Sequence, residues 1–201
     1  MIGWLYDLLS ERSERAGIEA RRRELLAPLE GDVLEVGVGT GRNLPHYVRA
    51  RRVVAIEPDS GMAKRLPERL AAAKIPVEVV SASAERLPFP DASFDAAVST
   101  FVFCSVDDPA VALAEIHRVL RPGGRFILME HVRGDGRTAR WQDRLTPLHR
   151  RLAGNCRLNR DTRAAVASAG FDTREVRAAE LPASHPLVRP SIYGVAIKTS
   201  S

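Results

Sequence analysis

A glycine-rich segment preceded by an acidic residue is the first part of the chain that indicates chemistry. Gly37, Gly39 and Gly41 follow a short apolar run, and Glu35 stands two residues before the first glycine. Because glycine has no Cβ, such a segment lets a ligand approach the backbone closely. Dinucleotide-binding loops have the spacing G-x-G-x-x-G and hold a pyrophosphate, whereas this loop is G-x-G-x-G. A carboxylate at Glu35 repels phosphate and suits a ligand that carries an ammonium group.

Two further acidic residues follow the next two apolar runs. Glu57 lies at the end of the second run, where an acid can accept hydrogen bonds from both hydroxyls of a ribose. Glu85 follows the third run, where it can accept from an exocyclic adenine amine. Three carboxylates at the ends of three adjacent strands predict a site for a cationic nucleoside. S-adenosylmethionine (SAM) has this chemistry without a phosphate, and S-adenosylhomocysteine would be its product.

The elements that must position these residues alternate between short β-branched runs and helical stretches, which is typical of a parallel α/β sheet. Two later strands are near enough in sequence to pair as an antiparallel hairpin at the sheet edge. We therefore predict an α/β fold: a single doubly wound, Rossmann-like sheet of seven mainly parallel strands with an antiparallel C-terminal hairpin and helices on both faces. The expected strands are Asp32 to Val36, Arg52 to Glu57, Val77 to Ser81, Phe94 to Thr100, Gly124 to Val132, Phe171 to Ala178 and Ile192 to Lys198.

Helices are expected between these strands and in a leading segment over residues 1–30. In the polar helix predicted after the fifth strand, Trp141, Leu145 and Leu148 stand at core spacing. The expected helices after the leading segment are Asn43 to Val48, Gly61 to Ala73, Pro109 to Leu120, Arg137 to Leu152 and Arg160 to Ala169.

Length and composition agree with one globular domain over residues 1–201. The chain has 201 residues, of which 45% are hydrophobic and 27% charged. Within this domain we expect residues 133–170 to form a lid or substrate insertion. No apolar run approaches the ~18 residues of a membrane span, and the start lacks the features of a signal peptide, which favours a cytoplasmic location.

Charge and cysteine content exclude two other classes of site. The net charge of +5 comes from scattered basic residues without an aromatic-interleaved groove, so no nucleic-acid partner is expected. The two cysteines, Cys104 and Cys156, lack the spacing of a metal knuckle, so no metal is expected. The sequence makes no prediction of the oligomeric state.

Four motifs in order resemble the class I SAM-dependent methyltransferases over roughly Val33 to Val132. They are Glu35 to Gly41, Glu57-Pro58-Asp59, Ala84 to Phe89 with Phe94-Asp95, and Val119 to Gly124. The resemblance implies that Asn43 lies near the methionine end, that Met62 packs on the adenine, and that Thr100 and Phe101 line the methyl-transfer face. The cofactor contacts that it implies, together with those argued above, are Glu35, Gly37, Gly39, Gly41, Asn43, Glu57, Pro58, Met62, Ser83, Ala84, Glu85, Thr100 and Phe101.

The later part of the chain resembles one group within that class, the microsomal alkyl thiol methyltransferases of the methyltransferase-like 7 group. This resemblance implies transfer of a methyl group to the sulfur of a small lipophilic thiol. Two features depart from the group: Val38 stands where a Cys is common, and the mildly apolar start is shorter than a membrane anchor, leaving at most weak membrane-surface contact through the leading helix. The segments that carry the resemblance are Thr100 to Val106, Met129 to Val132, Gly154 to Cys156 with Leu158 to Arg160, and Val188 to Lys198.

Two residues at strand ends are the candidates for catalysis and acceptor binding. His131 ends the fifth strand and has a pKa near working pH, so it can take the proton of a thiol. Cys104 follows the fourth strand. Tyr193 can donate its phenol to the acceptor, and Tyr6 can close the site from the leading helix. Three of these residues have a structural alternative. His131 can be a hydrogen-bonded histidine of the core, Cys104 a small hydrophobic residue that lines a wall, and Tyr193 an aromatic residue of an edge strand.

Other interpretations remain open on the sequence alone. The glycine segment can be a tight turn, Glu57 and Glu85 surface acids, and Met62 ordinary core. The stretch Arg42 to Tyr47 also resembles phosphatidylethanolamine N-methyltransferases, so methylation of that lipid or another small amine is the alternative activity. A nicotinamide-dependent dehydrogenase is disfavoured by the glycine spacing, and a non-catalytic binding module is the remaining class.

Overall fold

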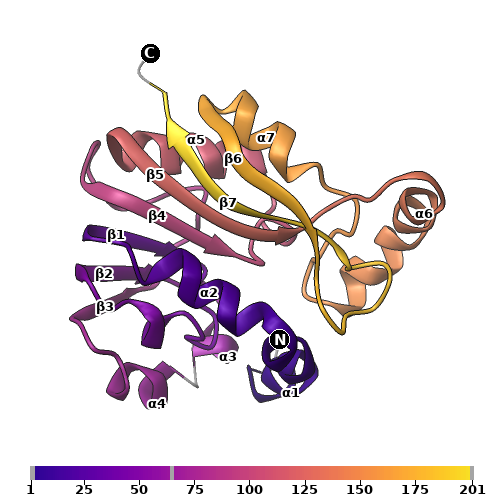
Figure 1. Cartoon of the computed structure of the whole chain (residues 1–201), viewed down its shortest axis with the longest axis horizontal. Coiled ribbons are helices and arrows are strands. Elements are labelled where there is room, and N and C mark those ends of the chain that lie inside the picture. The colour runs from indigo at the N-terminus through magenta and orange to yellow at the C-terminus, as the bar shows by residue number, and fades with distance from the viewer. Residues whose placement is uncertain (1–2, 64–65, 200–201) are drawn as a thin grey trace.

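A seven-stranded sheet forms the centre of the molecule (Figure 1). The computed structural model describes residues 3–63 and 66–199, without the side chains of residues 3–6, 9, 60 and 63. Along the sheet the strand order is β3-β2-β1-β4-β5-β7-β6. The strands are β1 (Gly31–Val36), β2 (Ala50–Ile56), β3 (Val77–Val80), β4 (Phe94–Thr100), β5 (Leu120–His131), β6 (Phe171–Glu180) and β7 (Pro190–Lys198).

The pairing of these strands confirms the predicted fold class. Strands β1 to β5 pair in parallel, and β7 pairs antiparallel with both β5 and β6. The order reverses at β1, which has β2 on one side and β4 on the other, so the carboxyl ends of these strands flank the crevice in which doubly wound sheets bind ligands.

Helices cover both faces of the sheet because the central strands are apolar on both sides. On one face, α5 and α7 pack against Leu34 and Phe126. On the other, α2, α4 and the chain after the glycine segment pack against Val33 and Ile127. The helical elements are α1 (Gly3–Ser13), the π-helical η1 (Glu14–Ile18), α2 (Glu19–Leu26), the 3-10 turn η2 (Leu44–His46), α3 (Ser60–Ala63), α4 (Leu66–Ala71), α5 (Pro109–Val119), α6 (Gly136–Leu152) and α7 (Thr162–Ser168).

Two of the predicted helices are shorter than expected. The helix expected over Asn43 to Val48 is only the 3-10 turn η2, because β2 already begins at Ala50. The helix expected over Gly61 to Ala73 is described as the two short helices α3 and α4, with Pro67 in the first turn of the second.

Helix α6 corrects the predicted buried face. Trp141 and Leu148 are 51% and 56% exposed, and Leu145 is half-buried, whereas Gln142 and Thr146 are buried. The side-chain amide of Gln142 explains this orientation: it donates to the carbonyls of Val132 and Leu187 and accepts from the N–H of Gly134. The helix is oriented by hydrogen bonds to the sheet edge rather than by its apolar stripe. No helix in the described ranges is both long and apolar enough to cross a membrane.

Candidate active site

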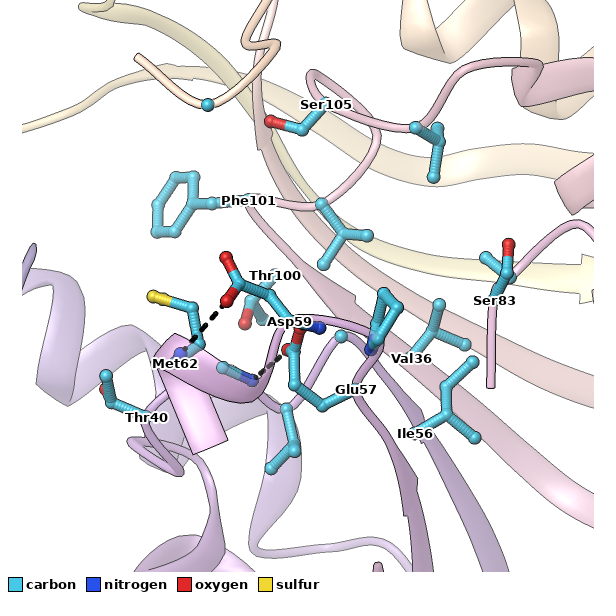
Figure 2. A pocket seen from close by; sticks show the side chains of 18 of the residues that line it. Val36, Thr40, Ile56, Glu57, Asp59, Met62, Ser83, Thr100, Phe101 and Ser105 are labelled. Atoms are coloured by element: carbon cyan, nitrogen blue, oxygen red, sulfur yellow. Dashed lines mark hydrogen bonds between the residues drawn. The ribbon is translucent and has the colours of Figure 1, made fainter. Parts of the chain in front are cut away.

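A cavity of about 450 Å³ lies at the carboxyl ends of the strands, where the doubly wound topology places ligands. Figure 2 shows side chains from β1, β2 and β4 converging on it. Of the thirteen residues predicted to contact the cofactor, eleven line this cavity and two, Glu35 and Gly41, do not. The eleven are Gly37, Gly39, Asn43, Glu57, Pro58, Met62, Ser83, Ala84, Glu85, Thr100 and Phe101.

The three glycines of the first motif serve two different purposes. A Cβ on Gly37 would come within 2.6 Å of Val102, and one on Gly41 within 3.1 Å of Leu66, so both positions are closed by the protein itself. A Cβ on Gly39 would meet only Met62 Cε at 3.4 Å and a backbone oxygen at 3.9 Å. Gly39, with φ of 57°, is therefore the glycine of the three that leaves space beside the backbone open toward the cavity.

Backbone hydrogen bonds fix the carboxylate of Glu57 at the end of β2. Its Oε2 accepts from the N–H of Gly39 at 2.7 Å, and its Oε1 accepts from the N–H of Asp59 at 2.9 Å. Burial raises the pKa of Glu57, although these two hydrogen bonds oppose the rise. Each oxygen keeps a further lone pair, so the carboxylate can still accept hydrogen bonds from a ligand.

Glu35 lies beneath the cavity and is 2% exposed. Its Oε1 accepts from Asn43 Nδ2 at 3.0 Å, and Asn43 borders the cavity. Burial raises the pKa of Glu35 to about 7, although Tyr47, Asn43 and the charge of Arg22 oppose the rise. The direct contact with an ammonium group that the sequence predicted stays a prediction, and the structure gives Glu35 the role of orienting Asn43.

The loop after β3 forms the side of the cavity opposite Met62. Ser83, Ala84 and Glu85 line it. Glu85 accepts from the hydroxyl of Ser83 and, at 3.0 Å, from the N–H of Asp107. Partial burial alone would raise the pKa of Glu85, but these hydrogen bonds outweigh it and lower the pKa. Glu85 thus joins the predicted adenine side of the cavity to the loop that follows β4.

Thr100, the last residue of β4, and Phe101 after it line the part of the cavity that the sequence resemblance assigns to methyl transfer. The hydroxyl of Thr100 accepts from Asn43 Nδ2 at 3.1 Å. Phe101 has a φ of 60°, a left-handed conformation that is uncommon for a large side chain and that is found where the surrounding structure enforces it. Its N–H donates to the carbonyl of Met129, and its ring is at the cavity in Figure 2.

A buried arginine from the leading segment is the main site residue that the sequence analysis did not identify. Arg22 is 3% exposed and lines the cavity. It is paired with Glu14 at 2.8 Å and donates to Asn43 at 2.6 Å and to Thr100 at 3.0 Å. The run of three arginines at 21–23 was visible in the sequence, but only the fold distinguishes the buried one from its exposed neighbour Arg23.

The leading helix is also held onto the glycine segment by a second charged network. Asp7 accepts from Thr40 at 2.8 Å and pairs with Arg42 at 3.0 Å and Arg69 at 2.9 Å. Burial raises the pKa of Asp7, but Thr40 and the two arginines outweigh it and lower the pKa. We refer to Gly3–Leu26 with these two networks as the amino-terminal wall.

The opposite side of the cavity is built by two segments that are about fifty residues apart in sequence. Ser105, Val106, Ala153 and Gly154 line it. Contacts from residues 155–160 to carbonyls of residues 103–107 join the two segments, which we call the acceptor wall. These contacts include Asn155 Nδ2 to Ser105 O at 2.6 Å, Arg157 N to Cys104 O at 2.8 Å, Arg157 Nη1 to Val106 O at 2.9 Å, and Arg160 to the carbonyls of Phe103 and Val106.

The predicted catalytic residues lie beside this wall and do not line the cavity. His131 and Cys104 are 5% and 4% exposed, and His131 Nε2 is 3.1 Å from the sulfur of half-buried Cys156. Contact with Cys156 and burial raise the pKa of Cys104 well above its usual value. Burial lowers the pKa of His131, but Cys104 and Glu130 outweigh it and raise the pKa. The fold therefore gives His131 a second cysteine as its partner.

The two predicted tyrosines differ in what can be said of them. Tyr193 packs in an apolar cluster with Ile18, Met129 and Leu181, and the guanidinium of Arg21 lies 4.1 Å from its ring centre. It does not border the cavity, so its contact with the acceptor stays a prediction. The side chain of Tyr6 lies outside the described residues.

The residues around the cavity fit the cofactor that the sequence predicts. Gly39 leaves room for a ligand, Glu57 presents a fixed acceptor, and Asn43 and Thr100 are oriented by buried partners. The volume is within the range of small-molecule and cofactor sites. These features are those of the SAM-dependent methyltransferase class, and a family model described as "Methyltransferase domain" matches residues 34–128.

Comparison with known proteins identifies the family within that class. Thiol S-methyltransferase TMT1A from Homo sapiens is 36% identical over 192 residues, which cover 89% of this chain and 79% of that protein. The chain belongs to the thiol S-methyltransferase family. Phosphatidylethanolamine N-methyltransferase from Cereibacter sphaeroides is also 36% identical, but over 122 residues, or 58% of this chain and 60% of that protein.

A solved structure supports the same fold. A SAM-dependent methyltransferase from Thermotoga maritima, described as a possible histamine N-methyltransferase, superimposes with a TM-score of 0.71 and 25% identity. The match covers 96% of this chain and 93% of that one. The doubly wound fold and the SAM-dependent methyltransferase class are thereby confirmed.

Proposed function

We propose that the protein transfers the methyl group of SAM to the sulfur of a small lipophilic thiol. The observation that carries this proposal is the extent of the family match, since 89% of this chain aligns with a thiol S-methyltransferase and the alignment is too long to be confined to the cofactor half. The acceptor wall belongs to the part of such folds that selects substrate, because the cofactor loops are shared by many chemistries.

The cavity residues act by binding, orientation and exclusion of water. When bound, SAM supplies an electrophilic methyl group on a positively charged sulfur. Glu57 and Asn43 hold the ribose and the amino-acid end, and Gly39 admits the ligand to the backbone. Phe101, Val102 and Val106 line the side at which an acceptor enters, and their apolar surfaces favour a lipophilic thiol.

Exclusion of water is the main help that this lining can give to a thiolate. A thiolate that attacks a sulfonium neutralises charge, so the reaction gains when both are removed from water and aligned. A free thiol has a pKa of ~8.5 and is mostly protonated at neutral pH. The site must therefore also raise the fraction of thiolate, and the histidine and cysteines beside the acceptor wall are the groups placed to do so.

A panel of acceptors with methyl-labelled SAM tests the proposal. Aliphatic thiols, an aryl thiol, phosphatidylethanolamine vesicles, a small amine and a phenol are compared, and mass spectrometry identifies the methylated atom. We expect label on sulfur, with more label on lipophilic than on charged thiols. Gly39→Val, in which a side chain enters the cavity, serves as the inactive control and is checked for folding by circular dichroism.

Label on nitrogen of the lipid or amine, with none on thiols, would support the alternative activity and overturn this one. That alternative is the weaker of the two, because the phosphatidylethanolamine N-methyltransferase match covers 58% of this chain.

A further inference from the structure

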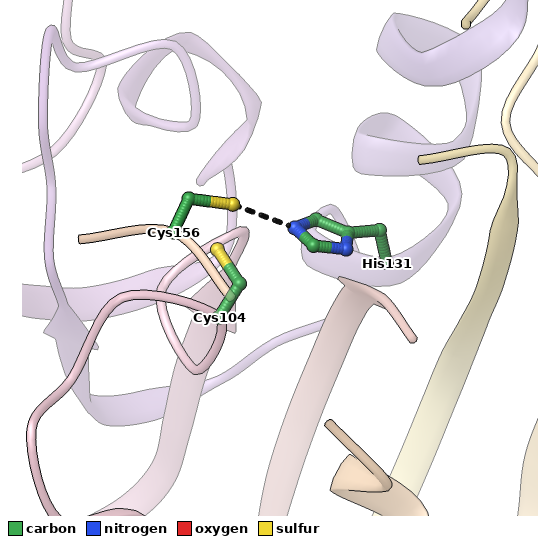
Figure 3. Close-up of side chains that lie close together, drawn as sticks. All are labelled: Cys104, His131 and Cys156. Atoms are coloured by element: carbon green, nitrogen blue, oxygen red, sulfur yellow. Dashed lines mark hydrogen bonds between the residues drawn. The ribbon is translucent and has the colours of Figure 1, made fainter. Parts of the chain in front are cut away.

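Three side chains of the types that bind soft metal ions lie close together beside the acceptor wall. Cys104 lies in the turn after β4, His131 ends β5, and Cys156 follows α6. Their ligand atoms all lie within 4.8 Å of one another, and Figure 3 shows the imidazole facing the two sulfur atoms. Sequence spacing gave no sign of this group, because Cys104 lies 27 positions before His131 and Cys156 lies 25 positions after it. The fold alone brings them together.

We propose that Cys104, His131 and Cys156 form a binding site for a thiophilic divalent cation such as Zn²⁺. Two thiolates and an imidazole are a donor set that zinc takes, with bond lengths of about 2.3 Å to sulfur and about 2.0 Å to nitrogen. Tetrahedral bonds of these lengths put ligand atoms roughly 3.5 to 3.8 Å apart. His131 Nε2 and the Cys156 sulfur are 3.1 Å apart, and no separation in the group exceeds 4.8 Å, so side-chain shifts of about 1 Å are enough.

The backbone around each of the three residues is already held in place. The carbonyl of Cys104 accepts from Arg157 N at 2.8 Å, and the carbonyl of Cys156 lies 3.0 Å from His149 Nδ1. His131 is within the β5–β7 ladder opposite Ser191. Such positioning before the ion arrives lowers the ordering cost of binding.

The second nitrogen of the imidazole also has a neighbour suited to a metal site. His131 Nδ1 and the hydroxyl of Ser191 are both buried, and neither has a hydrogen-bond partner among the described residues. Residues opposite each other in an antiparallel ladder project from the same face of the sheet. Rotation of the Ser191 hydroxyl would let it accept from Nδ1–H, the type of outer contact that orients a metal-binding histidine.

Three protein ligands leave one tetrahedral position for a further ligand, as in catalytic zinc sites. Cys156 is the half-buried member of the group, and its neighbour Gly154 lines the cavity together with Ser105. On the proposed function, we assign the fourth position to the acceptor thiol. Binding forms three metal–sulfur bonds and one metal–nitrogen bond, and the three thiol protons pass to solvent. His131 then acts as a ligand through Nε2, which replaces its predicted role as a proton acceptor.

Metal binding is tested on the full chain without reference to activity. The reduced protein is freed of metal with a chelator and titrated with Co²⁺, whose sulfur-to-metal charge-transfer absorption reports thiolate ligands, and then with Zn²⁺ in competition. We expect one ion per chain, and at least about tenfold weaker binding in Cys104→Ala, His131→Ala and Cys156→Ala. His185→Ala, which changes an exposed histidine, is the matched control and should bind as the parent does.

Folding of the variants is checked by their affinity for SAM, which should match that of the parent protein. Absence of a thiolate-to-cobalt absorption in the parent protein would overturn the site. Cobalt binding that persists unchanged in both cysteine variants would also overturn it.

The fourth position is tested by adding a small aliphatic thiol to the cobalt-loaded protein. We expect the absorption of the bound cobalt to shift and intensify. We also expect the metal-free protein to methylate the thiol at least about tenfold more slowly than the zinc-loaded protein, and to recover its activity when Zn²⁺ is added. An unchanged spectrum, or full activity without metal, would overturn the assignment of the fourth position to the acceptor. If the protein binds cobalt at this site but methylates no thiol, the proposed function is wrong while the metal site stands.

Discussion

The two walls of the cavity are held together in different ways. The amino-terminal wall depends on charge: Arg22 with Glu14 and Asp7 with two arginines are ion pairs with little exposure to solvent. The acceptor wall depends on hydrogen bonds to backbone carbonyls, donated mainly by Asn155, Arg157 and Arg160. One wall is thus a set of paired charges beside the glycine segment, and the other is two loops joined by hydrogen bonds to main-chain carbonyls.

This difference predicts how well each wall tolerates amino-acid substitution. Removal of one member of a buried ion pair leaves an unpaired charge, which is strongly destabilising, so the amino-terminal wall tolerates little change. Side chains on the acceptor wall can change while the carbonyl hydrogen bonds keep its shape, which suits the part of a methyltransferase that selects its substrate.

The largest effect is expected from Arg22→Ala. The variant removes both hydrogen bonds from Arg22 to buried Glu14, which among the described residues keeps only Arg42 Nε at 4.0 Å, and it removes donors to Asn43 and Thr100. The free energy of unfolding should therefore fall by about 3–5 kcal/mol. Urea unfolding measures the change, and Arg23→Ala, at the exposed neighbouring position, is the control, with an effect within about 0.5 kcal/mol. A double variant with Met at both 14 and 22 removes both charges and should recover part of the loss. Equal stability of the two alanine variants would contradict the importance of the buried pair.

The next largest effect concerns the pH dependence of stability. Burial raises the pKa of Glu35 from 4.5 to about 7, so the folded protein holds a proton that the unfolded chain releases between these values. The stability that comes from holding this proton is fully present below pH 4.5 and is lost as the pH rises through 7. The free energy of unfolding changes by about 3 kcal/mol over this range. Relative to Glu35→Gln, the parent should therefore lose stability as the pH increases from 5 to 8. Parallel stability curves of the two proteins over this pH range would contradict the raised pKa.

Glu57→Ala should weaken SAM binding without unfolding the protein. The hydrogen bonds of a carboxylate to ribose hydroxyls are worth about 1.5–3 kcal/mol, or roughly 10- to 150-fold in the dissociation constant. Isothermal titration calorimetry measures the dissociation constant for SAM. The Glu57→Gln variant keeps two oxygen lone pairs but not the charge, so its dissociation constant should lie between those of the parent and Glu57→Ala. An unchanged dissociation constant in Glu57→Ala would mean that the ribose lies elsewhere.

The smallest effect is expected on the acceptor wall, at Asn155. Its φ of 67° is left-handed, and its amide donates to Ser105 O and to Asp107. Asn155→Gly removes these hydrogen bonds and the one that Asn155 Oδ1 accepts from Arg150 Nε at 3.2 Å, and it should raise the KM for the thiol a few-fold. Asn155→Ala adds a backbone cost of about 1–2 kcal/mol. SAM affinity should be unchanged in both. A loss of SAM affinity equal to the loss for the thiol would show that the two walls do not act separately.

The cofactor half could be predicted from sequence because local patterns specify it. Strand β4 was predicted with its observed bounds, Phe94–Thr100, since a β-branched and apolar run buried on both faces leaves little choice of boundary. Gly39 and Glu57 followed from their spacing relative to the strands. Glu35, in β1, and Gly41, in the loop that follows, were placed next to the cavity but do not line it, because spacing does not distinguish a residue that touches a ligand from one that supports it.

The acceptor half could not be predicted in the same way, because its contacts join distant segments. Cys104 and Cys156 meet only once α6 is placed against the sheet, and Gln142, rather than the apolar Trp141, determines how that helix lies. Arg22 had the same appearance as its neighbours Arg21 and Arg23 until the leading segment was folded over the glycine loop. Periodicity shows that a helix has an apolar stripe, but it does not show what covers the stripe.

The connection between β6 and β7 has a kinetic consequence. At one end of it, the hydroxyl of Ser184 is 3.1 Å from that of Ser13 in the leading helix, and at the other the carbonyl of Leu187 accepts from Gln142 of α6. A single short loop therefore contacts both the leading helix and α6, which belong to different sides of the molecule (Figure 1). A movement that separates α1 from α6 must also displace this loop, so departure of the used cofactor and of the methylated product would share one opening event. Turnover would then be limited by the frequency of that event whenever chemistry is faster.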